Sequence, residues 1–144
     1  MIWNITFEER LAIWRGLRDS IQQLPLESAL LAINDWWWSL PMVDHSLSWY
    51  DPEQWPTPWD LIGYHGFCGL ARALGMSYTV MMLQRPDIND ITIIMTHDDN
   101  LVRVNQGKYI MNWCPGDIVN IRSQDSAVLT TLDSDRLQKK LGLK

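Results

Sequence analysis

Cys68 and His97 are the two side chains of this sequence whose types and order suit nucleophilic catalysis. Cys68 stands in the stretch GFCGLARALG, at the start of a predicted helix, where unpaired backbone amides stabilise a thiolate. A nucleophilic thiol also needs a base, and His97 follows a predicted strand. Either Asp99 or Asn112, both later in the chain, would then orient the imidazole. This order predicts a cysteine-dependent acyl-transfer enzyme.

The same residues also have a purely structural interpretation. A buried cysteine behaves as a small hydrophobic residue, and Cys68 is followed by Leu70, Ala71 and Leu74, which suit a helix packed on a sheet. A histidine in a turn that contains aspartates is more often exposed than catalytic. The residues alone therefore leave both alternatives open.

Tryptophan is the second unusual feature. The chain has nine, of which eight lie in the first sixty residues, and each ring buries roughly 150–250 Å² when it is packed. Three stand consecutively at residues 36–38, at the end of a predicted helix, so they point about 100° apart and cannot all face one core. Exposed indoles suit docking onto other proteins. Stacking on sugars is a further alternative, although core packing is more typical. The docking candidates are Trp36, Trp38, Trp49, Trp55 and Trp59.

These residues must be positioned by two kinds of element. Residues 1–38 form a predicted helical pair, because Thr6 and Glu9 make a capping box ahead of apolar residues at helical spacing, and Pro25 opens the second helix. Residues 39–59 form a loop rich in Trp and Pro. Helices follow over residues 57–75, with Thr57 as an N-cap. Gly75 is expected to end the last of them in a left-handed conformation.

The pattern changes after residue 75. Residues 77–83, 91–96, 101–104 and 108–113 are predicted strands separated by turn sequences, and residues 118–122 are a possible fifth. A short C-terminal helix is expected over residues 134–141. The predicted fold is one α+β domain of residues 1–144, with N-terminal helices packed on a four- to five-stranded antiparallel sheet over residues 77–122.

Composition limits the function classes. The net charge is −5 and basic residues form no block, so no nucleic-acid partner is expected. The sequence has no run of about 18 apolar residues, so no membrane span is predicted. The N-terminus lacks the apolar core of a signal peptide. Two cysteines without zinc-ligand spacing indicate a reducing compartment, although a single disulfide between them stays open. We expect neither a metal nor a cofactor.

The segments GFCGLARALGM, LVRV and KYIMNWCPG together resemble the transglutaminase-like (papain-like) motif over residues 59–120. The resemblance implies a distantly transglutaminase-like fold and an amidase or peptidase activity with Cys68 as nucleophile. The sequence departs from the motif at three points. Asp99 stands in the histidine position, two residues from His97, Asn112 stands in the aspartate position, and the predicted helix is about two turns short. The resemblance therefore implies an inherited scaffold with an altered triad.

A second resemblance covers most of residues 30–122. The segments DWWWSLPM, DPEQWPTPWDLI, FCGLARALGMSYT and KYIMNWCPGDIVNI are similar to a family of small proteins encoded by tailed bacteriophages, often near virion genes. It implies a non-enzymatic structural or assembly subunit of a tail or baseplate. Its partners would be other virion or assembly subunits, and it would occur in the host cytoplasm during assembly and then in the virion.

Overall fold

Four α-helices precede an antiparallel sheet in the part of the chain that the computed structural model describes, which is residues 4–43, 47, 51–96, 99–118, 128–133 and 139. The predicted α+β class is confirmed. The elements in chain order are α1 (Phe7–Ile21), α2 (Leu26–Trp38), the 3-10 helix η1 (Pro52–Gln54), α3 (Pro58–Ile62), α4 (Gly69–Met82), β1 (Ile91–Thr96), β2 (Asn100–Val104), β3 (Tyr109–Met111) and β4 (Val128–Leu132).

The sheet has the strand order β3-β2-β1-β4, and all neighbouring strands are antiparallel. Ile93 of β1 pairs with Val102 of β2, which pairs in turn with Met111 of β3. All three side chains are fully buried. Because residues that pair across strands share one face of a sheet, these three mark the face that lies against the helices.

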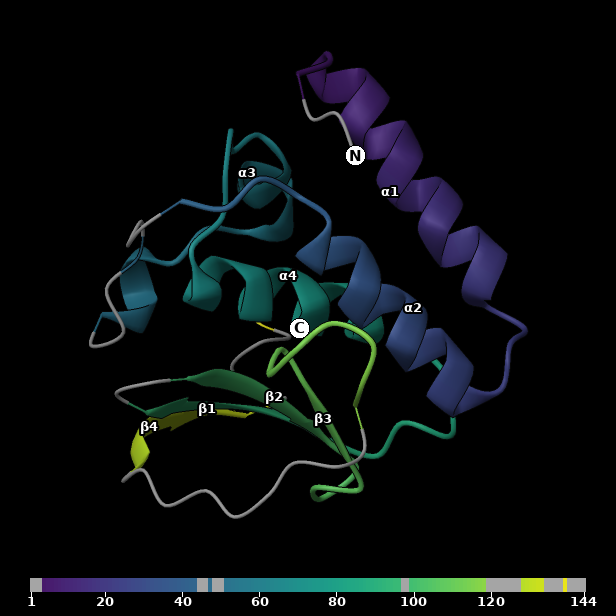
Figure 1. The fold of residues 1–144 in the computed structure, drawn as a ribbon, viewed down its shortest axis with the longest axis vertical. Coiled ribbons are helices and arrows are strands. Elements are labelled where there is room, and N and C mark those ends of the chain that lie inside the picture. The colour runs from purple at the N-terminus through teal and green to yellow at the C-terminus, as the bar shows by residue number, and fades with distance from the viewer. Residues whose placement is uncertain are drawn as a thin grey trace.

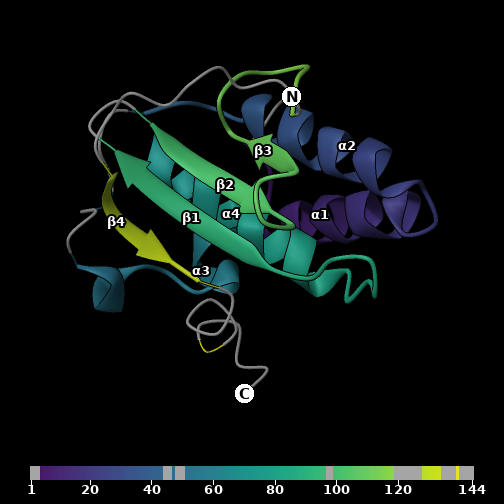
Figure 2. The same ribbon diagram turned by 90° about the horizontal axis from the view of Figure 1, so that it is seen from below.

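The helices lie in layers over one face of the sheet (Figures 1 and 2). Helix α4 packs against β1 and β2, and α2 lies beside it and reaches β3. Helix α1 contacts α2 and α3, and Figure 1 shows it on the outer side of the helical layer. This arrangement encloses α4, of which the residues from Leu70 to Met81 are all buried.

Side-chain caps begin two of the helices as predicted. The Thr6 hydroxyl accepts a hydrogen bond from the Glu9 amide at 3.1 Å, and the Thr57 hydroxyl accepts one from the Asp60 amide at 3.3 Å. Pro25 is the N-cap of α2, one position before the predicted one. Each cap satisfies an amide that has no partner within its helix, so local sequence determines where these helices begin.

The strand predicted over residues 77–83 is wrong, because this segment continues α4 to Met82. The run SYTVMML has the β-branched and apolar residues of a strand, but the core surrounds it on every side, and a helix buried all round has no amphipathic pattern. Ser77 and Thr79 fit the helix because their hydroxyls donate to the carbonyls of Ala73 and Gly75, four residues earlier.

Gly75 does not end a helix, so this prediction is also wrong. It lies in the middle of α4, and a Cβ atom built on it would overlap the indole ring of Trp37 on α2. The residue is glycine because α2 and α4 approach closely here, and not because the backbone turns left-handed. As a consequence, α4 has 14 residues and is longer than the sequence suggested.

We expect Gly75→Ala to lower the free energy of unfolding by about 1–3 kcal/mol, because the new methyl group displaces the Trp37 ring in a packed core. Gly16→Ala is the matched control, since Gly16 also lies inside a helix but a Cβ there meets nothing within 4 Å. That change should stabilise the protein by about 0.5–1 kcal/mol. Urea denaturation followed by fluorescence measures both, and equal effects would contradict the close approach.

The remaining elements were predicted in part. Strands β1, β2 and β3 lie within or next to predicted strand segments, whereas β4 had no predicted counterpart. Of the possible fifth strand, residues 119–122 lie outside the described residues, as does the C-terminal helix apart from Lys139. Within the described ranges, no helix combines the length and apolar character that crossing a bilayer would require.

Candidate functional site

Cys68 is the N-cap of α4, as its predicted place at a helix start required. Its Sγ accepts a hydrogen bond from the Ala71 amide at 3.4 Å, and only 4% of the residue is exposed. Cys114 is partly exposed, and both residues, each in the described part of the chain, carry thiols instead of a shared disulfide. The structure therefore places the candidate nucleophile at a helix start but seals it from solvent.

Arg72 lies one turn after Cys68 and is the feature of this site that the sequence did not reveal. It is 5% exposed, and its Nε donates to Asn112 Oδ1 at 2.6 Å. Its guanidinium lies over the Trp38 ring, 3.3 Å from the ring centroid. A third contact runs from Nη1 to the Met42 Sδ at 2.9 Å. Arg72 thus joins α4 to the end of α2 and to the residue that follows β3.

Asn112 completes this junction through its side-chain amide and its backbone N–H. Its Nδ2 donates to the carbonyls of Gly69 at 3.0 Å and Asn100 at 2.7 Å, and its amide donates to Asn34 Oδ1 at 2.9 Å. Its φ of 71° lies in the left-handed region, which asparagine tolerates better than most residues. We call Cys68, Arg72, Asn100 and Asn112 the helix-start cluster.

Burial dominates the electrostatics of this cluster. It lowers the pKa of Arg72 to about 10, and the nearby Cys68 thiol acts in the opposite direction. Burial also raises the pKa of Tyr64, with smaller contributions from Asp60 and Cys68. Among the described residues no carboxylate pairs with Arg72. The guanidinium is still charged at neutral pH, so Asn112 and Trp38 take the place of a counter-ion.

The structure brings together some of the predicted catalytic residues and separates others. Asn112 lies beside the start of α4 through its bond to Gly69, whereas Asp99 is exposed in the turn between β1 and β2. There the Thr96 amide donates to the Asp99 carbonyl at 2.9 Å. His97 lies outside the described residues. Asn100 also lies against Gly69, because a Cβ built on that glycine would be 3.1 Å from Asn100 Nδ2.

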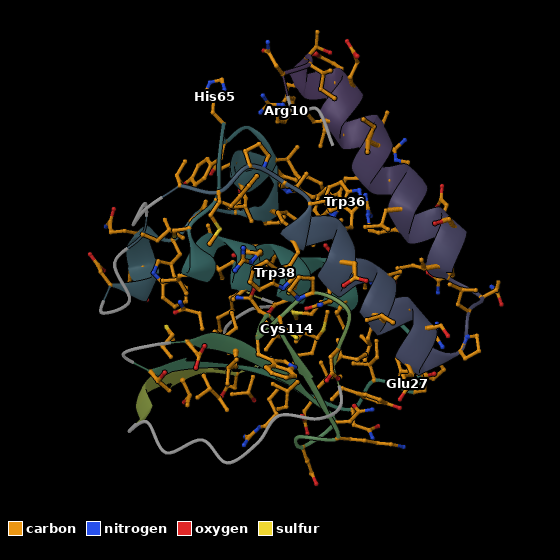
Figure 3. All side chains as sticks on the ribbon, viewed as in Figure 1. Arg10, Glu27, Trp36, Trp38, His65 and Cys114 are labelled. Atoms are coloured by element: carbon orange, nitrogen blue, oxygen red, sulfur yellow. The ribbon has the colours of Figure 1, made fainter. Side chains whose placement is uncertain are left out.

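The side chains of the three consecutive tryptophans point in different directions, as their helical spacing predicts. Trp37 is 1% exposed in the core, while Trp36 and Trp38, which Figure 3 labels, are half-buried. Trp36 packs edge-on against Trp37, and Trp38 lies under Arg72. Neither is a freely presented indole. Trp49, another docking candidate, lies outside the described residues.

Trp55 and Trp59 behave in opposite ways. Trp55 is 4% exposed, so the prediction that it docks on a partner is wrong. The adjacent Pro56 carbonyl accepts a hydrogen bond from the buried Tyr78 hydroxyl at 2.8 Å, which fastens this part of the loop onto α4. Trp59 is 47% exposed, and its ring lies edge-on to the ring of Trp14, with the two centroids 6.0 Å apart.

Phe7 is a second exposed aromatic residue and lies against α3. It is 40% exposed, and its ring lies 3.9 Å from a Cβ built on Gly63. Because Gly63 follows Trp59 by four residues, which is about one helical turn, Phe7 and Trp59 belong to the same junction of α1 with α3. We call Phe7 and Trp59 the α1–α3 patch.

We expect Cys68→Ala to lower the free energy of unfolding by about 1 kcal/mol, because Ala71 loses its N-cap acceptor. Cys68→Ser should leave it nearly unchanged, since a serine hydroxyl accepts the same bond. Thermal denaturation of both variants measures the difference. Equal loss in both would contradict the capping role.

The described residues contain no group of three or more His, Cys, Asp or Glu side chains that could hold a metal ion. Comparison of the chain with protein-family models, with curated proteins and with solved structures finds no match.

Proposed function

We propose that this chain is a non-enzymatic structural or assembly subunit of a tailed-phage particle, in the tail or baseplate, which docks onto other subunits through the α1–α3 patch. The observation that carries the docking role is the 47% exposure of Trp59, together with the 40% exposure of Phe7 at the same junction of α1 with α3. Large aromatic side chains are enriched at interface centres, and tryptophan is the most frequent hot-spot residue. The assignment to a phage particle rests on the resemblance of the sequence.

The charges around the α1–α3 patch suggest the character of the partner surface. Glu8 follows Phe7, and Asp60 follows Trp59, and both carboxylates are exposed. Arg10, the nearest cation on α1, instead points inward and donates to the carbonyls of Ile62 and Tyr64. A partner surface with an apolar centre and basic edges would complement the patch.

The helix-start cluster supports a non-enzymatic role over the thiol-enzyme alternative. An acyl-transfer enzyme needs a nucleophile that a substrate can reach, and Cys68 is 4% exposed. Asn112 would have to orient a base, but its side chain already bonds Arg72, Gly69 and Asn100. We propose that the scaffold is distantly transglutaminase-like and that a structural junction has replaced the triad.

The cysteine hydrolase or transferase that uses Cys68 and His97, with Asp99 or Asn112, is our second proposal. It is favoured by one observation, the place of Cys68 at the start of a 14-residue helix packed on an antiparallel sheet.

A phage genome that encodes Trp59→Ser tests the docking role. We expect the amount of this chain in purified particles to fall about tenfold or more, as the loss of a hot-spot tryptophan implies. Leu24→Ser is the matched control, because Leu24 is 38% exposed and lies at the turn between α1 and α2, away from the patch. Normal incorporation of a folded Trp59→Ser chain would contradict the proposal.

A further inference from the structure

Exposed apolar side chains lie at both ends of the short connection between α3 and α4. At one end the Phe7 ring lies 3.9 Å from a Cβ built on Gly63, and at the other end Val43 Cγ1 lies 2.5 Å from a Cβ built on Gly66. Phe7 is 40% exposed and Val43 is 41% exposed. The two glycines are three residues apart, so their Cα atoms lie within about 11 Å of each other. The α1–α3 patch therefore has a second exposed apolar group close to it.

Backbone hydrogen bonds hold residues 41–43 beside this connection. The Phe67 amide donates to the Pro41 carbonyl at 2.9 Å, and the Val43 amide donates to the Phe67 carbonyl at 3.2 Å. Met42 lies between these two bonds and is 60% exposed. Because the segment is already ordered, a partner that covers it does not have to order this backbone on binding. We call Phe7, Met42, Val43 and Trp59 the extended patch.

The exposed carboxylates around the extended patch have no exposed Lys or Arg beside them. Residues 4–12 and 57–67 contain three carboxylates, all of them exposed, on Glu8, Glu9 and Asp60. Arg10 is the one Lys or Arg in these two segments, and it is buried, with its guanidinium directed at backbone carbonyls. Residues 41–43 are uncharged. A partner with cations at the edges of an apolar surface would complement this arrangement.

We propose that the extended patch binds one amphipathic helix of a partner subunit, with apolar residues on the face that meets the patch and Lys or Arg along its edges. Apolar residues seven positions apart on a helix are separated by about 10.5 Å, which is close to the upper limit for the distance between Gly63 and Gly66. Because glycine has no side chain, the connection stays low enough for a helix to lie across it. This inference rests on the proposed docking role and names the class of partner.

Titration of the purified chain with a synthetic helical peptide, followed by calorimetry, tests the class of partner. The peptide has about five turns, with leucines on one face and lysines along its edges. We expect this peptide to bind, and we expect the same peptide with glutamates in place of the lysines not to bind. Failure of the lysine peptide to bind, or equal binding of the two peptides, would overturn the proposal.

Glu8→Lys should weaken binding of the lysine peptide about tenfold, because it places a like charge at the edge of the extended patch. Glu27→Lys is the matched control and should leave binding unchanged. Each glutamate is exposed and is the second residue of its helix, and Figure 3 shows Glu27 at the opposite end of the molecule from Arg10, which lies near Glu8 on α1. Equal effects of the two changes would show that the peptide responds to net charge alone, which overturns the proposal.

Val43→Ser should also weaken binding of the lysine peptide about tenfold, because it removes an apolar contact at the far end of the connection. Leu24→Ser, which changes another exposed apolar residue, is the control and should leave binding unchanged. Circular dichroism checks that each variant folds, and if either Glu8→Lys or Val43→Ser does not fold, the other decides. Normal binding of the deciding variant overturns the proposal.

The peptide titration requires no phage particle, so its failure can be distinguished from failure of the docking role. If Trp59→Ser lowers incorporation into particles but the lysine peptide does not bind, docking stands and the helical partner is wrong. If the peptide binds as expected but Trp59→Ser chains are incorporated normally, the helix-binding surface stands and the role in the particle is wrong.

Discussion

Thr79→Val is expected to lower the free energy of unfolding by about 2–5 kcal/mol, because each buried donor left without an acceptor costs roughly 1–3 kcal/mol. The Thr79 hydroxyl accepts from two indoles, from Trp14 Nε1 at 2.9 Å and from Trp37 Nε1 at 3.1 Å. Both rings are buried, at 0% and 1% exposure. Valine nearly matches threonine in volume, so the loss reports the hydrogen bonds and not a cavity.

Ser77→Ala is the matched control for this change. Ser77 is buried on the same helix, but its hydroxyl donates only to the Ala73 carbonyl, at 2.8 Å. Its removal orphans no donor of another side chain, and we expect a loss below about 1 kcal/mol. Urea denaturation with tryptophan fluorescence compares the two variants. Similar losses would show that the shared acceptor of Trp14 and Trp37 does not stabilise the helical layers.

Asn112→Ala should lower the free energy of unfolding by about 3–5 kcal/mol, because it removes the acceptor for a buried guanidinium and leaves that charge poorly compensated. It also removes the hydrogen bonds that Asn112 Nδ2 donates to the carbonyls of Gly69 and Asn100. Gln106→Ala controls for the backbone, since Gln106 has a similar φ of 58° but is exposed. That change should stay within about 0.5 kcal/mol.

Asn112→Asp makes the same test more specific. The aspartate keeps an acceptor for Arg72 Nε and even supplies a counter-ion, but it loses the two N–H donors that bond Gly69 and Asn100. We expect the variant to be less stable than the natural chain at neutral pH. If the aspartate instead stabilised the protein, the amide donors would not hold the cluster together, and the structural interpretation of Asn112 would be wrong.

Local sequence predicted the parts of the fold that local chemistry determines. Thr6 and Thr57 cap their helices because a hydroxyl reaches an amide three residues away. The sequences between β1, β2 and β3 contain Asp, Asn and Gly residues, which favour turns. Asn105, Gln106 and Gly107 all have positive φ. These features need no knowledge of distant residues, and they were predicted close to where the structure has them.

The wrong predictions share a different physical cause, which is contact between distant segments. The length of α4 depends on a core that encloses it, and Gly75 is explained only by Trp37, 38 residues earlier. Trp55 is buried in a loop that Tyr78, 23 residues later in the chain, fastens to α4 through the neighbouring Pro56 carbonyl. In each case the deciding partner lies outside the window in which periodicity and turn chemistry can be recognised.

The candidate site shows the same difference between features that local sequence determines and features that depend on distant contacts. The position of Cys68 at a helix start could be predicted from its neighbours, and its burial was one of two interpretations left open, whereas its N-cap bond was not predicted. The partners of Arg72 could not be predicted from its neighbours, because Trp38 and Asn112 lie 34 residues before it and 40 residues after it. An arginine within an apolar helix is the one local anomaly that could have directed attention to this cluster.

Particle incorporation and infectivity of phages that carry either Cys68→Ser or Trp59→Ser test the central claim most directly. Cys68→Ser keeps the N-cap acceptor but removes the thiol, and we predict normal particles with normal infectivity. Trp59→Ser leaves the thiol intact, and we predict particles in which the amount of this chain falls about tenfold or more. The reverse result, in which the serine variant at residue 68 fails and the variant at residue 59 succeeds, would contradict the docking account and support thiol chemistry.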